Sequence, residues 1–341
     1  MITFPSNVRL AGAVLTAAVL ATGCSGATAA APVASPTRSR AALAAPVEPT
    51  IAVVRKSGAL ELYGVAPGPR AHLIRTLRGP KGMRAGEVTL AAGPSPKVCA
   101  DWDNATRSAV VCYAPFASTG AVVLTGTSPS FGGLALSAAG TSLAWLGGGS
   151  PRTYDLYFAR LSGSRTGPAT RLPGPVQGAD EAVLGVGDIA WDGESTLLVS
   201  HSYDDDVNGE IARVSVNAPP SDWSGGPLVH SAPPWDVLWG AGSATHQGRT
   251  YLLQEGFFDP NGREETRAVE MDMATGRVVS VVSFPAKDRR MSEISGGPAG
   301  VLYVTEGDSG PRRSYWRSPG QAHGRPLGGL PSDASDVVAQ P

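Results

Sequence analysis

A short apolar segment that recurs about every fifty residues constrains the fold of this chain more than any other sequence feature. The segments are residues 50–55, 108–113, 141–146, 195–200, 250–255 and 300–305. Each is rich in Val, Leu, Ile or aromatic residues and is bounded by Gly, Pro, Asn or Asp clusters, a pattern typical of strands. Downstream of residue 24, no ten-residue stretch has the 3.6-residue apolar periodicity of a helix. The sequence therefore predicts an all-β protein.

The repeated unit predicts a closed ring of sheets. Each unit reads as a first strand, a turn, an apolar second strand, a polar loop and an alternating third strand. A period of about fifty residues is typical of four-stranded propeller blades. Six units predict a six-bladed β-propeller with about four strands per blade. The alternative is a pair of β-sandwiches, which a linker near the middle of the chain would favour, and the sequence shows no clear linker.

The two chain ends predict how the ring closes. In later units a first strand precedes the apolar segment, but only Ala-Pro-Val-Glu-Pro precedes Thr50. At the other end, residues 334–341 contain the strand-like pair Val337-Val338 and no further unit follows. We expect this C-terminal segment to supply the inner strand of the first blade. Such pairing removes an open sheet edge that would otherwise favour aggregation.

The third unit, residues 134–172, resembles a known repeat. TolB-type and WD40-like propellers repeat a Ser-Pro-Asp-Gly turn, an apolar strand and Asp-Leu-Tyr. The matching residues are Gly140, Leu143, Ala144, Asp155, Leu156 and Tyr157. Ala138 and Ala139 replace the Pro and Asp of the repeat, so the Asp that usually braces the turn is absent. The resemblance implies the fold and no particular activity, because propellers host many unrelated functions.

The N-terminal region has the organisation of an exported lipoprotein. Residues 1–23 read as a signal peptide, with Arg9 followed by an apolar run, residues 10–20, that is too short to span a bilayer. Residues 20–24, Leu-Ala-Thr-Gly-Cys, resemble a bacterial lipobox, which implies lipidation of Cys24. The alternative is an ordinary signal peptide cleaved within residues 27–31. We expect the protein at the outer face of the bacterial cell membrane, held there by its lipid anchor.

The remaining composition separates a tether from a folded domain. Residues 24–48 are mainly Ala, Pro, Ser and Thr, which cannot bury enough apolar surface to fold, whereas residues 49–341 form the expected propeller. Basic residues are nearly all Arg, and Ala, Gly and Pro are abundant, which is typical of a GC-rich genome and of a lipoprotein of an actinobacterial type. The net charge of −1, with no polybasic run, does not indicate nucleic-acid binding.

Cys99 and Cys112 flank a segment whose centre, residues 103–108, has turn composition. The two thiols therefore face each other across an expected hairpin. In an exported protein this geometry favours a disulfide, which would contribute about 2–3 kcal/mol by closing so short a loop. The alternative is a pair of reduced, buried cysteines.

One loop has the spacing of half a calcium site. The candidate metal ligands are Asp204, Asp206, Asn208 and Glu210. Alternate oxygens and the bend at Gly209 match the first half of a calcium loop, but Ala212 and Ser215 stand where its later ligands would be. The alternative, which we favour, is a type I′ hairpin turn at Asn208-Gly209. Calcium is therefore the one cofactor that the sequence suggests.

Several acids are expected near the mouth of the propeller channel, where concave ligand sites form. They are Asp188, Asp192, Asp236 and Glu293. These carboxylates could hold a metal, as in gluconolactonase-like propellers, or only solvate the channel. The chain has no G-x-S-x-G, H-E-x-x-H or Walker-type motif, so we expect no catalytic residues. The favoured function is non-catalytic binding or scaffolding for an unknown protein or small-molecule ligand. The alternative is a metal-dependent hydrolase or lactonase.

Tryptophan residues predict the contacts between blades. Those in or beside the expected strands should fill the gaps between adjacent blades, where aromatic side chains commonly pack. They are Trp102, Trp145, Trp191, Trp239 and Trp316. Trp223 and Trp235 lie nearer to loops, so we expect these two to be exposed.

Overall fold

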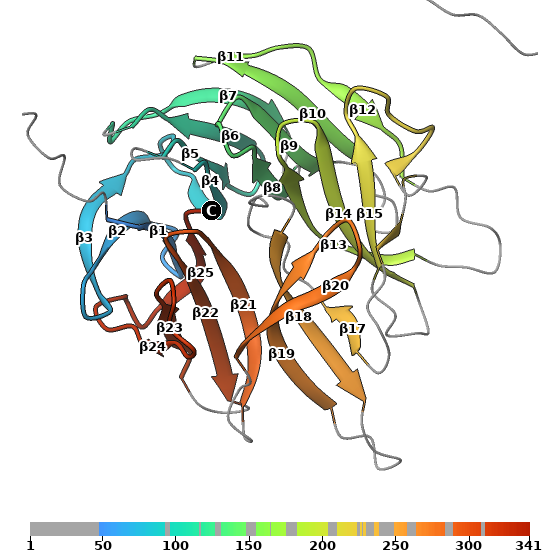
Figure 1. The fold of residues 1–341 in the computed structure, drawn as a ribbon. Helices are drawn as coiled ribbons and strands as arrows, with labels where there is room; N and C mark the ends of the chain where they lie inside the picture. Colours follow the sequence, from blue (N-terminus) through green and yellow to red (C-terminus); the bar gives the residue numbers. More distant parts are fainter. Residues whose placement is uncertain are drawn as a thin grey trace, which may run out of the picture. The chain divides into compact units, whose positions relative to one another are not determined.

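A computed structural model shows six β-sheets arranged as blades around a common axis (Figure 1). It describes residues 48–92, 96–115, 117–126, 131–147, 155–163, 165–174, 183–203, 210–223, 226, 228–229, 235–238, 249–257, 264–283, 289–307 and 311–341. The predicted signal peptide, Cys24 and residues 25–47 of the tether lie outside the described residues. The described ranges contain no helix long and apolar enough to cross a membrane. The ring of six sheets confirms the predicted six-bladed propeller.

The first three blades follow one another along the chain. Blade 1 contains β25 (Ala334–Ala339), β1 (Thr50–Arg55), β2 (Leu60–Ala66) and β3 (Arg70–Leu77), from the axis outward. Blade 2 contains β4 (Arg84–Leu90), β5 (Val98–Asp103), β6 (Ser108–Tyr113) and β7 (Ala121–Gly126). Blade 3 contains β8 (Phe131–Leu136), β9 (Ser142–Gly147) and β10 (Asp155–Ser162), and both β11 (Arg165–Thr166) and β12 (Thr170–Leu172) pair with β10.

The other three blades have four strands each. Blade 4 contains β13 (Val183–Asp192), β14 (Thr196–Tyr203), β15 (Glu210–Ser215) and β16 (Leu228–Val229). Blade 5 contains β17 (Trp235–Leu238), β18 (Arg249–Phe257), β19 (Glu264–Asp272) and β20 (Arg277–Ser283). Blade 6 contains β21 (Arg289–Gly297), β22 (Gly300–Gly307), β23 (Arg313–Arg317) and β24 (Arg325–Pro326). All strand pairs within the blades are antiparallel.

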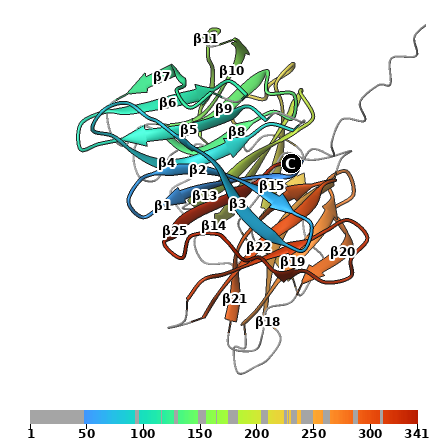
Figure 2. The same ribbon diagram turned by 90° about the vertical axis from the view of Figure 1, so that its left-hand side faces the viewer.

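The C-terminal strand closes the ring as predicted. β25 pairs with β1, placing Ala339 opposite Ile51 and Val337 opposite Val53. The amide of Gln340 extends the ladder by donating to the carbonyl of Thr50 over 2.9 Å. The red β25 lies beside the blue β1 in Figure 1 and again after the quarter turn of Figure 2. The first blade therefore combines both ends of the folded chain, and β1 has no open inner edge.

The apolar second strand of a blade packs against the blades on both of its sides. Successive side chains of a strand point to opposite faces of its sheet. In β1, Ile51 and Val53 belong to the buried cluster that contains Trp316 of blade 6, whereas Ala52 belongs to the cluster that contains Trp102 of blade 2. Each of the six buried clusters likewise joins two neighbouring blades. This burial on both faces explains why these strands are apolar without alternation.

One predicted second strand is a third strand instead. Residues 108–113 form β6, and the second strand of blade 2 is β5. Two acids, Asp101 and Asp103, make β5 resemble a polar first strand in the sequence. The true first strand, β4, carries Arg84 and Glu87 and lacks the apolar run that marks a strand most clearly. Polar residues near the axis therefore caused the error.

Tryptophan burial agrees with the expected packing except at one position. Trp102, Trp145, Trp191 and Trp316 are buried between blades as predicted. The expectation of an exposed Trp223 is wrong, because its side chain is 1% exposed and lies in the cluster between blades 3 and 4. Its backbone amide donates to the carbonyl of Pro173, which draws this segment onto blade 3. Trp239 and the side chain of Trp235 lie outside the described residues.

The predicted disulfide is present. Cys99 on β5 lies directly opposite Cys112 on β6, with an S–S distance of 2.00 Å. Both residues are buried in the cluster between blades 2 and 3. The covalent bond therefore fixes the register of the two middle strands of blade 2.

Candidate functional site

A three-residue pattern recurs on the innermost strands: a small residue, an acid and an aliphatic residue. The pattern is Gly-Glu-Val at residues 86–88 of β4, Gly-Asp-Ile at 187–189 of β13, Ser-Glu-Ile at 292–294 of β21 and Ser-Asp-Val at 335–337 of β25. At each position the register with the next strand shifts, which marks a β-bulge. Bulges re-aim side chains and are common near functional sites. Four blades thus present a carboxyl group at the ring axis.

In β4, close packing against the neighbouring strand requires the small residue of the pattern. A Cβ atom on Gly86 would lie 2.6 Å from Oδ1 of Asp101. The Asp101 carboxylate accepts hydrogen bonds from the backbone amides of Gly86 and Glu87, so it holds the bulge from the neighbouring strand. Burial raises the pKa of Asp101 to about 6, while these two amides lower it. Asp101 therefore forms a second layer behind the axial carboxyls.

The axial carboxyl groups influence one another across the channel. Burial raises the pKa of Glu87 to about 8, helped by the charges of Asp188, Asp101 and Asp336. Burial and the charge of Asp336 raise the pKa of Asp188 to about 7. Glu87 is exposed and Asp188 is half-buried, so water enters the space between them, although the surrounding protein desolvates both carboxyl groups enough to raise their pKa. The four groups consequently behave as one interacting set.

Asp336, on the closing strand, acts on every other member of this set. Burial and Asp336 raise the pKa of Glu293 to about 8, against the opposing effect of Arg312. The pKa of Asp336 itself is raised to about 6 by burial. Hydrogen bonds from the amides of Val88 and Val337 limit this rise by stabilising the carboxylate. Asp336 thus connects blade 1 to the backbone of blade 2 at the axis.

Arg312, which follows β22, lies against these acids. Its guanidinium contacts Glu293 and pairs with Glu306 over 2.8 Å. It also donates to the carbonyls of Ala334 and Ser335 over 3.1 and 3.0 Å. One oxygen of Glu293, Oε2, is buried and has no hydrogen-bond partner in the described part of the chain. Arg312 therefore neutralises part of the acidic set and binds the closing strand.

Side chains of one blade also satisfy free backbone amides of the next. Oε2 of Glu87 accepts from the amide of Leu134 over 3.1 Å, and Oγ1 of Thr89 accepts from the amide of Leu136 over 3.0 Å. The hydroxyl of Ser295 accepts from the amide of Ala339 over 2.8 Å. Innermost strands have no strand on their axial side, so their buried amides need such acceptors. The same contacts keep the axial carboxyls aligned.

The structure brings together two of the four channel acids predicted from the sequence. Asp188 and Glu293 belong to the axial set, whereas Asp192 pairs with Arg213 of its own blade over 3.2 Å. Asp236 lies on the innermost strand β17, but its side chain lies outside the described residues.

The half calcium loop falls mostly beyond the part that the structure describes. Asp204, Asp206 and Asn208 lie outside the described residues, as does the side chain of Glu210, whose backbone begins β15. Among the side chains that are described, no group of three or more His, Cys, Asp or Glu could hold a metal ion.

Sequence reasoning missed Glu87, Asp101, Arg312 and Asp336. The recurring pattern of small residue, acid and aliphatic residue could have revealed Glu87 and Asp336, because both share it with Asp188 and Glu293. No comparable local signal marks Arg312 or Asp101, because only the fold brings these two residues beside the axial carboxyl groups.

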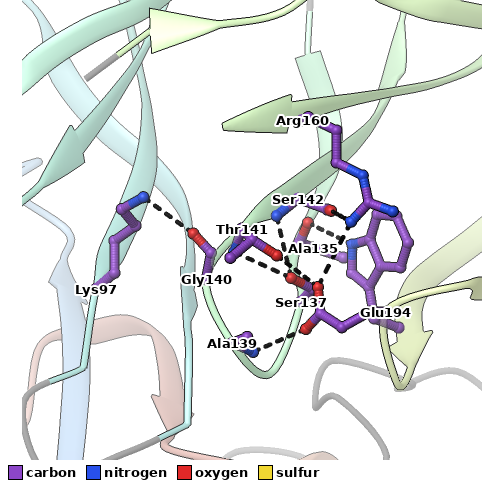
Figure 3. A network of polar contacts seen from close by, with 10 residues as sticks. Lys97, Ala135, Ser137, Ala139, Gly140, Thr141, Ser142, Arg160 and Glu194 are labelled. Atoms are coloured by element: carbon purple, nitrogen blue, oxygen red, sulfur yellow. Dashed lines mark hydrogen bonds and ion pairs between the residues drawn. The ribbon is translucent and has the colours of Figure 1, made fainter. Parts of the chain in front are cut away.

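A neighbouring blade replaces the acid that the third repeat lacks (Figure 3). Glu194, in the β13–β14 turn, accepts from the amide of Ala139 over 2.9 Å and from the hydroxyl of Thr141 over 2.6 Å. It also lies 3.8 Å from Arg160, which donates to the hydroxyl of Ser142 over 2.8 Å. The turn of blade 3 is therefore braced from blade 4.

A pocket of about 140 Å³ lies beside this brace, between blades 3 and 4. Phe158 and Pro168 line it together with Trp191, and Arg160 and Asn217 contribute polar groups. Because Glu194 and Ser142 already engage Arg160, the pocket offers no uncompensated charge. The axial carboxyls are the stronger candidate for ligand contact.

Solved structures show which fold this arrangement shares. TolB from Acinetobacter baumannii aligns with a TM-score of 0.56 and 14% identity, over 86% of this chain and 67% of that chain. A puromycin-hydrolyzing peptidase from Mycobacterium tuberculosis aligns at 0.50 and 17% identity, over 82% of this chain and 44% of that chain. A chain of a nidogen/laminin complex aligns at 0.51 and 9% identity, over 85% of this chain and 97% of that chain.

These similarities establish a TolB-like β-propeller fold. This chain spans less than half of the peptidase that it matches. No protein-family model and no curated protein sequence matches it. At these levels of identity the likeness concerns the fold alone, so the site has to be interpreted from its own residues.

Proposed function

We propose that this protein is a non-catalytic binding or scaffolding module whose channel accepts a positively charged group of a protein or small-molecule ligand. In this proposal Cys24 carries a lipid that anchors the chain at the outer face of the bacterial cell membrane. The acidic set carries the argument. Glu87, Asp188, Glu293 and Asp336 come from four blades and act on one another, and Arg312 is the base that opposes them.

The electrostatics favour a cationic ligand over an anionic one. Above the pKa of about 8 of Glu87 and Glu293, these two groups and the two axial aspartates all carry negative charge. Arg312 contributes one positive charge, so an excess of negative charge remains at the ring axis. Such surroundings focus the electric field and attract opposite charge. Propellers of similar length also occur in protein assemblies, as in the nidogen/laminin complex.

Binding of a cationic peptide tests this proposal. By calorimetry at pH 8, tetra-arginine should bind the wild-type protein and tetra-glutamate should not. Asp188→Asn should weaken tetra-arginine binding at least tenfold, because it removes one axial charge. Asp272→Asn is the matched control, since Asp272 ends β19 and its carboxylate accepts from amides of the turn that leads to β20, so its substitution should leave binding unchanged. Equal binding of the two peptides, or no effect of Asp188→Asn, would contradict the proposal.

Metal analysis of the same preparation tests the absence of metal-dependent catalysis. We expect no stoichiometric calcium or zinc and an unchanged melting temperature after chelation. A tightly bound metal together with a chelator-sensitive hydrolase or lactonase activity would contradict the non-catalytic proposal and support the enzyme alternative.

A further inference from the structure

We propose that protons shared among the axial carboxyl groups lock the ring at the seam between blades 6 and 1, so that the closing strand β25 loosens as pH rises. This device goes beyond the proposed binding function, and its test needs no ligand. It depends on where the closing strand places Asp336 relative to the acids and bases around it.

The closing strand carries its acid into the acidic set. Asp336 lies opposite Val54, directly after the bulge that leaves Ser335 unpaired in the β1–β25 ladder. Its carboxylate accepts from the amide of Val88 in β4, so Asp336 joins blade 1 to blade 2. Seating β25 therefore requires an acid to enter a protein-lined space that already holds Glu87 and Asp188.

Further acids lie on or behind the strands packed against β25. β21 contributes Glu293, β22 contributes Glu306, and Asp101 and Asp103 lie behind β4 on β5. Arg312 is the base that acts on Asp336 within the described part of the chain, and it already contacts two glutamates.

The bases on the strands packed against β25 are exposed or engaged elsewhere. Arg84 of β4 is exposed and donates to the carbonyl of Lys56, and Arg290 of β21 is exposed. Arg55, at the end of β1, pairs with Asp333 over 2.7 Å and with Glu61 over 3.5 Å. Arg289 of β21 donates to Thr305 and to the carbonyl of Pro311. Full ionisation of the axial acids thus leaves β25 facing uncompensated negative charge.

The sign of the pH effect follows from the raised pKa values. A carboxyl group whose pKa is higher in the closed ring than in the open chain binds more protons in the closed ring. Closure is therefore strongest below the ordinary pKa of about 4, weakens as pH rises, and reaches its minimum above about 8, where Glu87 and Glu293 ionise in both states. Each proton released on opening changes the opening equilibrium about tenfold per pH unit.

Hydrogen exchange of the intact protein between pH 5 and pH 9, corrected for intrinsic exchange rates, tests the device. Protection of β25 amides should fall at least a hundredfold from pH 5 to pH 8 and then level off. Protection of β9 amides, in the middle of blade 3, should change at least tenfold less. Asp336→Asn should make this loss of β25 protection at least tenfold smaller, because it removes the charge that acts on all the other axial carboxyl groups.

Two further variants complete the test. Asp188→Asn leaves the closing strand intact and should also reduce the loss of β25 protection. This variant takes the place of Asp336→Asn if that protein does not fold. Asp272→Asn should retain the wild-type fall. The proposal is overturned if β25 protection does not depend on pH, if all blades lose protection equally, or if the axial variants retain the full fall. Failure of tetra-arginine to bind would leave this result unaffected, so the two proposals fail separately.

Discussion

Deletion of residues 334–341 is expected to abolish the cooperative thermal unfolding transition of the propeller. The deletion removes β25, exposes the inner edge of β1 and takes Ala334, Val337 and Ala339 out of the buried cluster between blades 6 and 1. An unpaired apolar strand edge also promotes aggregation. Calorimetry should show no sharp transition, and size-exclusion chromatography should show aggregated material.

Deletion of Pro341 alone is the matched control. Pro341 follows the strand and lies outside the β1–β25 ladder, so this variant should retain a transition close to that of the wild-type protein. A truncated chain that lacks residues 334–341 but unfolds cooperatively near the wild-type temperature would show that β25 does not close the ring.

Substitution of Trp191 by Ala should lower the free energy of unfolding by about 3–5 kcal/mol, the usual cost of removing a large buried aromatic side chain. Trp191 is 1% exposed and fills the interface between blades 3 and 4. Its Nε1 donates to the carbonyl of Ala135 in the neighbouring blade over 3.1 Å. Urea unfolding followed by circular dichroism measures the change.

Substitution of the same residue by Phe separates volume from hydrogen bonding. Trp191→Phe retains most of the apolar contact but removes the donor to Ala135, so it should cost about 1–3 kcal/mol and less than Trp191→Ala. Equal stability of the wild-type protein and Trp191→Ala would contradict the view that apolar contacts between blades hold the ring together.

The blade repeat could be predicted from sequence because each second strand is buried on both faces. That burial requires long apolar runs, as in β1, and such runs stand out against the polar turns around them. The closing strand was also predictable, since Val337 and Val338 had no unit of their own to join. The error at β5 arose where Asp101 interrupts this pattern to hold the bulge in β4.

The candidate site was only partly predictable, because its members are separated by long stretches of sequence. Asp188 and Glu293 followed from the expected position of the innermost strands. Asp336 escapes this reasoning because the pair Val337-Val338 predicts a closing strand but does not show which carboxyl groups its neighbouring acid meets. Arg312 depends on the path of the chain between β22 and β23, which no local pattern encodes.

The third repeat shows a different limit of sequence comparison. Loss of the repeat's usual Asp at the Ala138-Ala139 turn suggested an unbraced turn. The structure supplies Glu194 from the next blade instead. A change within one repeat can thus be compensated by a residue more than fifty positions away, which an inspection of single repeats does not detect.

Titration of the carboxyl groups by ¹³C NMR tests the central claim most directly, namely that acids from four blades meet at one axis. In the wild-type protein, Glu87, Asp188 and Glu293 should titrate between about pH 7 and pH 8. In Asp336→Asn, all three should titrate at lower pH because a neighbouring charge is lost. If every Asp and Glu of the wild-type protein titrates below about pH 5, as isolated side chains do, the axial set does not exist.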